Sequence, residues 1–204
     1  DWSWSRGLGD VYKRQQWVEK VFGSYQYFRL WLVQLVGSLG DWLGFLAIAA
    51  AATELGGGTP ETAVGFVFTA RIIPGLFLAP LAGVLVDRWN RKKVMILCDL
   101  GRVAILLLLP FASTVWHLVL ASFALEIFTL LWIPAKDSVV PSIVPEESLT
   151  TVNSLQMAAT YGTVPIAASL FIFLGRFADK VETWPGAGSI NADQIGLGLS
   201  LIHI

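Results

Sequence analysis

The stretch "GVLVDRWNRKK", Gly83 to Lys93, carries five charged residues within its last seven positions. Apolar runs of about twenty residues flank it on both sides, the length that an α-helix needs to cross the hydrocarbon core of a bilayer. Charge is costly inside the bilayer, so charged loops between apolar runs are typical of chains that cross a membrane several times. We therefore interpret this stretch as a loop at the membrane surface that joins two spanning helices.

The composition predicts an all-α membrane protein. Of the 204 residues, 55% are hydrophobic and only 14% are charged, whereas a soluble domain carries about 25% charged residues. Open strands would leave backbone amides unpaired in lipid, so the spans are expected to be helices. The formal net charge of −1 gives no reason to expect nucleic acid as a partner. A single cysteine, Cys98, excludes an internal disulfide, and no metal site is expected.

Both ends of the chain resemble translated sequencing adapter. With suitable codons, "DVYKRQ" back-translates to GATGTGTATAAGAGACAG, and "LSLIHI" back-translates to its reverse complement. That DNA resembles the transposon end used to prepare sequencing libraries, and "SRGLG" resembles the adapter that precedes it. We therefore exclude residues 1–15 and 199–204 from the fold prediction as non-native. The remaining residues are expected to be an N-terminal fragment of a longer protein, unless these ends are native after all.

Five spanning helices are predicted, at residues 28–53, 62–86, 93–112, 115–135 and 149–175. About twenty residues at a rise of 1.5 Å per residue cross a hydrocarbon core of about 30 Å. Residues 16–27 then form a short N-terminal segment. Residues 176–198 are expected to form an external loop and the start of a truncated sixth helix.

The distribution of Lys and Arg predicts the orientation. Seven of these residues lie on the side of the chain's start: Lys20, Arg29, Arg88, Arg91, Lys92, Lys93 and Lys136. Only Arg176 and Lys180 lie on the opposite side. Because Lys and Arg are enriched in cytoplasmic loops, we expect a multi-pass protein of the inner (plasma) membrane with a cytoplasmic N-terminus.

The second predicted helix has small residues at a regular spacing. Gly75, Ala79 and Gly83 recur every four residues, and Asp87 follows four residues later. Small residues at this spacing let another helix approach closely. Asp87 would then lie at the membrane edge on the contact face, where it could accept hydrogen bonds from the N-terminus of another helix. A simple membrane anchor would explain the neighbouring cations, but neither the aspartate nor the aligned glycine.

This loop resembles the signature of the major facilitator superfamily, G-x-x-x-D-R-x-x-R-[RK]-[RK]. The matching positions are Gly83, Asp87, Arg88, Arg91, Lys92 and Lys93. The stretches "FRLWLVQLVGSLGDWL", "CDLGRVAILLLLP" and "IPAKDSVVPSIVPEESLTTVNSL" resemble its macrolide-efflux and enterobactin-exporter-like branch. The resemblance implies two six-helix bundles that work by alternating access, of which this chain would supply helices 1–5 of the N-terminal bundle. It also implies that Asp87 and its basic loop form a cytoplasmic gate against the other bundle.

Two features depart from the pattern of many antiporters in that superfamily. Their fifth helix carries G-P-x-x-G-G, of which "YGTVPIAAS" keeps a partial match in Gly162, Pro165 and Ala168. Their fourth helix often carries a basic residue, whereas "FALEIFTLLW" has Glu126. Antiport is therefore less firmly implied than membership.

Ionisable residues inside predicted spans are candidate functional residues, since each is costly in lipid. Asp41 lies about 20 Å from the inner edge and Arg71 about 13 Å below the outer edge, so the two could pair, as a functional or a static structural pair. Glu126 falls near mid-membrane among apolar neighbours. It is expected either to exchange a proton or bind substrate, or to serve as a hydrogen-bonded structural residue.

Two further groups complete the candidate residues. Asp99 and Arg102, spaced i and i+3, are expected to form an intrahelical pair that assists the gate. A polar stripe is expected to line a solute cavity or to join helices by hydrogen bonds; it comprises Gln34, Asn153, Gln156, Thr160 and Thr163.

No enzyme motif or nucleotide-binding glycine loop occurs in the sequence, so neither an enzyme nor a cofactor is expected. The resemblance implies a secondary active transporter, expected to export amphipathic or hydrophobic small molecules in exchange for protons and to contribute to multidrug resistance. Its expected partners are that substrate, protons, the lipid bilayer and the missing C-terminal half of the same chain. The alternatives are a lipid or lysophospholipid flippase of the same superfamily and a membrane scaffold or sensor that transports nothing.

Overall fold

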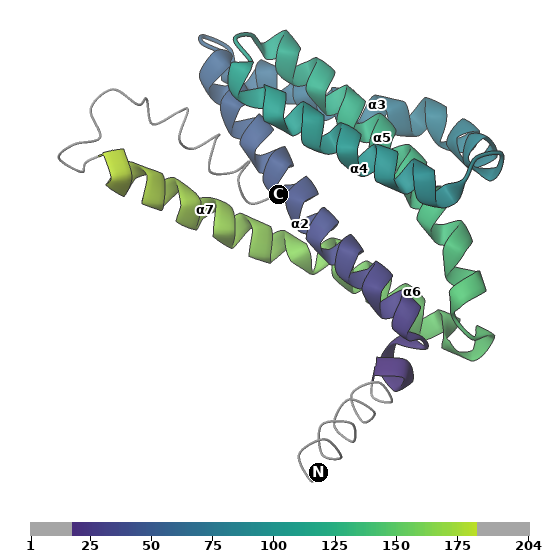
Figure 1. The fold of residues 1–204 in the computed structure, drawn as a ribbon. Coiled ribbons are helices and arrows are strands. Elements are labelled where there is room, and N and C mark those ends of the chain that lie inside the picture. The colour runs from purple at the N-terminus through teal and green to yellow at the C-terminus, as the bar shows by residue number, and fades with distance from the viewer. Residues whose placement is uncertain (1–17, 183–204) are drawn as a thin grey trace.

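The computed structural model describes residues 18–182, whose regular elements are helices alone (Figure 1). The main helices are α2 (Tyr25–Leu55), α3 (Pro60–Asp87), α4 (Arg91–Leu108), α5 (Val115–Ile143), α6 (Leu149–Tyr161) and α7 (Thr163–Glu182). Short 3-10 turns, η1 (Leu109–Phe111) and η2 (Glu146–Ser148), follow α4 and precede α6. Within residues 18–182, five helical segments are long and apolar enough to cross a membrane, the fifth being Glu146–Phe177, which includes α6 and most of α7. The predicted all-α membrane architecture is confirmed. Residues 1–17 and 183–204 lie outside the described part of the chain. They include the two stretches interpreted as adapter and the predicted start of a sixth helix.

The charged stretch that opens the sequence ends α3 and begins α4, as expected of an interhelical loop. α3 ends at Asp87, and α4 begins at Arg91 after only three intervening residues. The side chain of Asn90 accepts a hydrogen bond from the backbone N–H of Lys93 (3.2 Å), which caps α4. A cap of this kind satisfies one of the free N–H groups at the start of a helix.

Helix α5 is longer than the sequence suggested, since it continues to Ile143 instead of ending at residue 135. Lys136, the next residue, was counted among the cations of the cytoplasmic side. The Lys136 side chain is buried and bonded to polar neighbours, so the charge does not have to leave the bundle.

The predicted fifth span, 149–175, consists of two helices. α6 ends before Gly162 and α7 begins at Thr163. Pro165 lacks the N–H that would bond the carbonyl of Tyr161, and its ring crowds that carbonyl, so a break at this point has a direct cause.

Three apolar clusters surround a polar middle. At one end of the bundle, the end of α2 packs with the start of α3, the end of α4 and the start of α5, through residues such as Ala52, Ala63, Leu109 and Leu118. At the other end, Val86, Val94, Cys98, Trp132 and Ala135 join α3, α4 and α5. At that same end, Phe22, Tyr27, Val140, Val144 and Val152 join α2, α5 and α6.

Much of the outer surface is apolar. Leu76, Phe77 and Leu97 are 70%, 71% and 67% exposed. Contiguous exposed apolar surface is unusual in a soluble protein but is expected where helices face lipid.

Helices α4 and α5 approach closely at a glycine. A Cβ atom built at Gly101 would overlap the ring of Phe128. By contrast, a Cβ at Gly65 on the exposed face of α3 would meet nothing within 4 Å.

We predict that Gly101→Ala lowers the thermal unfolding midpoint, because overpacking a close contact costs about 1–3 kcal/mol. Gly65→Ala should leave the midpoint unchanged or raise it, because alanine favours helix over glycine. The measurement is unfolding of purified protein in detergent, followed by intrinsic fluorescence. The double variant Gly101→Ala/Phe128→Leu should recover part of the loss. Equal midpoints for the two glycine variants would contradict the proposed close packing.

Candidate functional site

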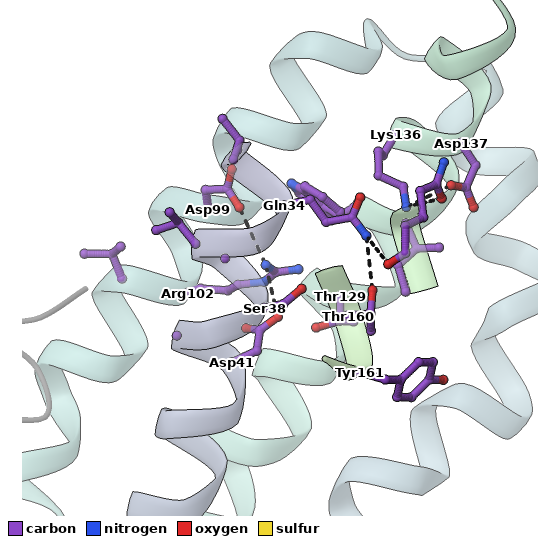
Figure 2. A pocket seen from close by; sticks show the side chains of 18 of the residues that line it. Gln34, Ser38, Asp41, Asp99, Arg102, Thr129, Lys136, Asp137, Thr160 and Tyr161 are labelled. Carbon is purple, nitrogen blue, oxygen red and sulfur yellow. Dashed lines mark hydrogen bonds and ion pairs between the residues drawn. The ribbon is translucent and has the colours of Figure 1, made fainter. Parts of the chain in front are cut away.

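A cavity of about 420 Å³ lies in the polar middle of the bundle, lined by α2, α4, α5 and α6 (Figure 2). Its polar lining comes from all four helices: Gln34, Ser38, Asp41, Asp99, Arg102, Thr129, Lys136, Asp137, Gln156 and Thr160. This volume falls within the range of about 300–1,000 Å³ that is common for small-molecule sites. The cavity is therefore large enough to hold a ligand between the apolar clusters.

Helix α2 presents a polar face to the cavity. Gln34, Ser38 and Asp41 are spaced by four and three residues, so they lie on one side of the helix. Gly37 and Gly40 also line the cavity and leave room beside these side chains. The spacing alone therefore explains why three polar residues of an apolar helix face the interior.

Arg102 is shared between two carboxylates on different helices. Its Nη1 atom lies 3.5 Å from Asp41 Oδ2 on α2 and 3.6 Å from Asp99 Oδ1 on its own helix α4. The guanidinium also lies over the Trp132 ring, 5.6 Å from its centroid. Figure 2 shows the arginine between the two acids. Because one cation faces two anions, this group carries a formal charge of −1.

Lys136 forms a second polar contact on the cavity wall. Its Nζ atom donates a hydrogen bond to Gln156 Oε1 (2.8 Å) and lies 3.1 Å from Asp137 Oδ1. It also lies 5.7 Å from the centroid of the Trp132 ring, on which Arg102 packs as well. The lysine therefore joins α5 to α6 and is neutralised by its immediate neighbours.

Helix α6 is held to α2 mainly through its backbone. Tyr27 donates through its hydroxyl to the carbonyl of Val152 (3.1 Å). Trp31 donates to the carbonyl of Leu155 (2.8 Å), and Trp42 donates to that of Thr160 (2.9 Å). In addition, Gln34 Nε2 donates to the Gln156 carbonyl (3.3 Å) and to Thr160 Oγ1 (3.1 Å). These bonds fix the wall that α6 contributes to the cavity.

Three buried polar atoms of the lining have no hydrogen-bond partner among the described residues. They are Gln34 Oε1, Arg102 Nε and Trp132 Nε1. The three residues are 4%, 8% and 7% exposed, respectively. A buried polar atom without a partner costs about 1–3 kcal/mol, so such atoms call for an explanation. All three belong to residues that line the cavity.

The predicted pair of Asp41 with Arg71 is wrong. Arg71 Nε lies 3.7 Å from Glu126 Oε2, and its guanidinium lies over the Phe45 ring at 5.0 Å. The position of a residue along its helix does not fix which neighbouring helix it faces. Arg71 lies on the side of α3 that faces α5. Neither Arg71 nor Glu126 lines the cavity. The expectation that Glu126 has only apolar neighbours is also wrong.

The predicted intrahelical pair of Asp99 and Arg102 is confirmed. Both residues line the cavity, however, so they are neighbours of Asp41 as well as of the charged loop. They were assigned to the gate because they lie near the cytoplasmic end of their predicted helix, close to the charged loop.

The predicted polar stripe divides into two parts. Gln34, Gln156 and Thr160 line the cavity. Asn153 is exposed away from it, and Thr163, beyond the break in the helix, donates to the carbonyls of Ala159 and Thr160. The cavity residues that the sequence did not predict are Ser38, Thr129, Trp132, Lys136 and Asp137. The spacing of Ser38 from Gln34 and Asp41 could have revealed Ser38.

The gate residues predicted from the loop signature are exposed. Asp87, Arg88, Arg91, Lys92 and Lys93 are all exposed. Within residues 18–182, Asp87 forms no ion pair. Gly75 and Gly83 have open space where a Cβ would be. The small-residue face of α3 is thus open to another helix, and the gate role stays a prediction.

We predict that Arg102→Leu destabilises the fold by about 2–3 kcal/mol. This is less than the 3–5 kcal/mol typical of a fully buried pair, because the two acids are partly exposed. Adding Asp41→Asn should recover part of the loss, since one uncompensated carboxylate is then removed. Unfolding in detergent of the two single variants and the double variant gives the coupling between the residues. Arg29→Leu, at an exposed position of α2, is the control. Additive effects of Arg102→Leu and Asp41→Asn would contradict the pair.

The chain is similar to known membrane transporters. The family model described as "Major Facilitator Superfamily" matches residues 30–192. Macrolide efflux protein A of Streptococcus pyogenes is 30% identical over 155 residues, which cover 72% of this chain and 38% of that protein. A protein of the same name from Enterococcus faecalis is 35% identical over 108 residues, covering 48% of this chain and 33% of that protein.

The uncharacterized MFS-type transporter YfiS of Bacillus subtilis is 30% identical over 113 residues, which cover 55% of this chain and 27% of that protein. The chain thus spans well under half the length of these relatives. No solved structure matches the chain. Because the family match covers most of the chain and its five membrane-length helices, the chain belongs to the Major Facilitator Superfamily of transporters, in the branch similar to macrolide efflux proteins.

Proposed function

We propose that this chain is part of a proton-coupled exporter of amphipathic small molecules, located in the inner membrane with its N-terminus in the cytoplasm. Membership of a transporter family and similarity to macrolide efflux proteins support export. The observation that carries the proposal is the single arginine nitrogen shared by Asp41 and Asp99 in a ligand-sized cavity. Orientation is supported by the excess of Lys and Arg on one side.

The shared arginine gives proton coupling a physical basis. When both acids are ionised, Arg102 compensates only one of the two negative charges. A proton on either acid leaves a neutral group in which the arginine pairs with the other acid. A substrate that interacts with an acid would compete with the proton for the same site, which is the requirement for exchange transport.

The Arg71–Glu126 pair is assigned a structural role in this proposal. It joins α3 to α5 outside the cavity, and each side chain already has an opposite charge beside it. Of the coupling candidates in the sequence, Asp41 is therefore preferred to Glu126.

The proposed gate is Asp87 with the basic residues that follow it. In this proposal, a second helical bundle packs on the open small-residue face of α3 and meets Asp87 when the cytoplasmic side is closed. The exposed position of Asp87 and the empty space beside Gly83 support that arrangement.

The coupling proposal predicts that Asp41→Asn abolishes efflux driven by a pH gradient. The uninterrupted reading frame that contains this sequence would be expressed in full and reconstituted into vesicles. Glu126→Gln should keep at least about half of the gradient-driven rate, because the cavity charges are unchanged. Glu61→Gln, an exposed acid at the start of α3, is the control. Retention of gradient-driven efflux by Asp41→Asn and its loss in Glu126→Gln would overturn the assignment.

The gate proposal predicts that Asp87→Asn opens the cytoplasmic side more often. In a Cys98→Ala background, Ser38→Cys would place a reactive thiol in the cavity. A membrane-impermeant maleimide applied from the cytoplasmic side should label it several-fold faster when Asp87 is neutralised, on the order of a 1 kcal/mol shift between states. Glu146→Gln, an exposed acid at the same end of the bundle, should leave the labelling rate unchanged. Equal rates in both variants would contradict the gate.

A further inference from the structure

Two buried cations from different helices share one aromatic ring. The guanidinium carbon of Arg102 on α4 lies 5.6 Å from the centroid of the Trp132 ring, and Lys136 Nζ on α5 lies 5.7 Å from it. The side chains of these cations are only 9% and 6% exposed. A ring attracts a cation within about 6 Å of its centroid, and the attraction is stronger where water is excluded. The indole therefore contributes to the position of both charges.

The Trp132 ring is itself fixed in place. Trp132 is 7% exposed and packs in the apolar cluster that joins α3, α4 and α5, together with Val86, Val94, Cys98 and Ala135. A side chain that is packed among residues of three helices has little freedom to change its rotamer, because protein interiors are close-packed. An arginine side chain, by contrast, has many rotamers of its own. The ring is therefore a fixed surface against which the flexible arginine rests.

Arg102 does not bind either acid in the manner that is usual for arginine. Its Nη1 atom lies 3.5 Å from Asp41 Oδ2 and 3.6 Å from Asp99 Oδ1. Arginine and carboxylate usually form hydrogen bonds of about 2.7–2.9 Å, frequently two in parallel. The longer and nearly equal distances describe an arginine that is held between two acids rather than bound to one of them.

The two acids differ in how much they depend on the direction of the arginine. Asp99 lies three residues before Arg102 on the same helix, so it stays within reach of the guanidinium. Asp41 belongs to α2, and its ion pair within residues 18–182 is with Arg102. A guanidinium free to turn toward Asp99 would form a shorter contact there and lose Asp41. The contact between the helices is thus the one that requires a fixed arginine.

As a deepening of the proposed function, on which its role in transport rests, we infer that Trp132 is a positioning residue. The face of its indole ring holds Arg102 between Asp41 and Asp99. In the proposed exchange, this shared position is what allows a proton on either acid to leave a neutral group. Without the ring, Arg102 pairs with Asp99 alone, and Asp41 is left without an ion pair.

The test measures the energetic coupling of Arg102 with each acid, with and without the ring. The protein expressed from the uninterrupted reading frame is unfolded in detergent, and the single and double variants of Arg102→Leu, Asp41→Asn and Asp99→Asn give two coupling energies. In a Trp132→Leu background, the coupling of Arg102 with Asp41 should fall by at least about half, because the attraction to the ring is lost. The coupling of Arg102 with Asp99 should stay the same or increase. A merely structural role of Trp132 would change both couplings alike.

Further variants separate the ring from the packing that it provides. Trp132→Met also lacks a ring, and its flexible side chain adapts to the space left, so it provides the same comparison if the leucine variant does not fold. Trp132→Phe keeps an aromatic face and should show a smaller fall than either ringless variant. Leu118→Ala is the matched control, because Leu118 is 1% exposed in the apolar cluster at the other end of the bundle. It should destabilise the protein and leave both couplings unchanged.

Three outcomes would each overturn the inference. They are an unchanged coupling of Arg102 with Asp41 in the ringless variants, an equal fall in both couplings, and a fall in Trp132→Phe as large as in Trp132→Leu.

The outcome is separable from that of the transport experiment. Loss of the coupling between Arg102 and Asp41 in Trp132→Leu, together with gradient-driven efflux by Asp41→Asn, would refute proton coupling through Asp41 and leave the positioning role standing. Couplings that Trp132→Leu leaves unchanged, together with efflux that Asp41→Asn abolishes, would refute the positioning role alone.

Discussion

The polar middle of this bundle depends on one interaction, the pairing of a single arginine nitrogen with two carboxylates. Arg102 connects α4 to α2 through Asp41 while it remains paired with Asp99 on its own helix. Because a charge inside a membrane must be compensated, the arginine holds both acids beside it, and all three residues line the polar cavity between the helices. The cavity, its net negative charge and its unpaired donors all follow from that arrangement.

Apolar clusters pack at both ends of the bundle, on either side of this polar group. One cluster closes the bundle at the end where α2 meets α3 and α4 meets α5. Two smaller clusters at the opposite end hold α3, α4 and α5, and α2, α5 and α6. Between these clusters the helices are held apart by polar side chains, whose desolvation is offset by ion pairs, hydrogen bonds and the Trp132 ring.

The sequence predicted the fold well because hydropathy and span length report directly on lipid contact. The charged loop between α3 and α4 was identified for the same reason. Prediction of the site was poorer because helical rise gives the depth of a residue but not which neighbour it faces. Thus Asp41 was placed at a suitable level but with Arg71 instead of Arg102. Lys136 was predicted to lie at the membrane surface because it is charged. Its burial depends on contacts with Gln156 and Asp137, and the contact with Gln156 of α6 is not visible in the local sequence.

The bonds between α2 and α6 have a consequence for how such a protein can diversify. Tyr27, Trp31 and Trp42 all donate to main-chain oxygens, which every amino acid possesses. These three bonds therefore do not depend on which side chains α6 carries. Residues of that helix which border the cavity, such as Met157 and Tyr161, can be exchanged while the helix stays in place. Substitutions in the part of α6 that lines the cavity can therefore change which ligands bind while the bundle keeps its fold.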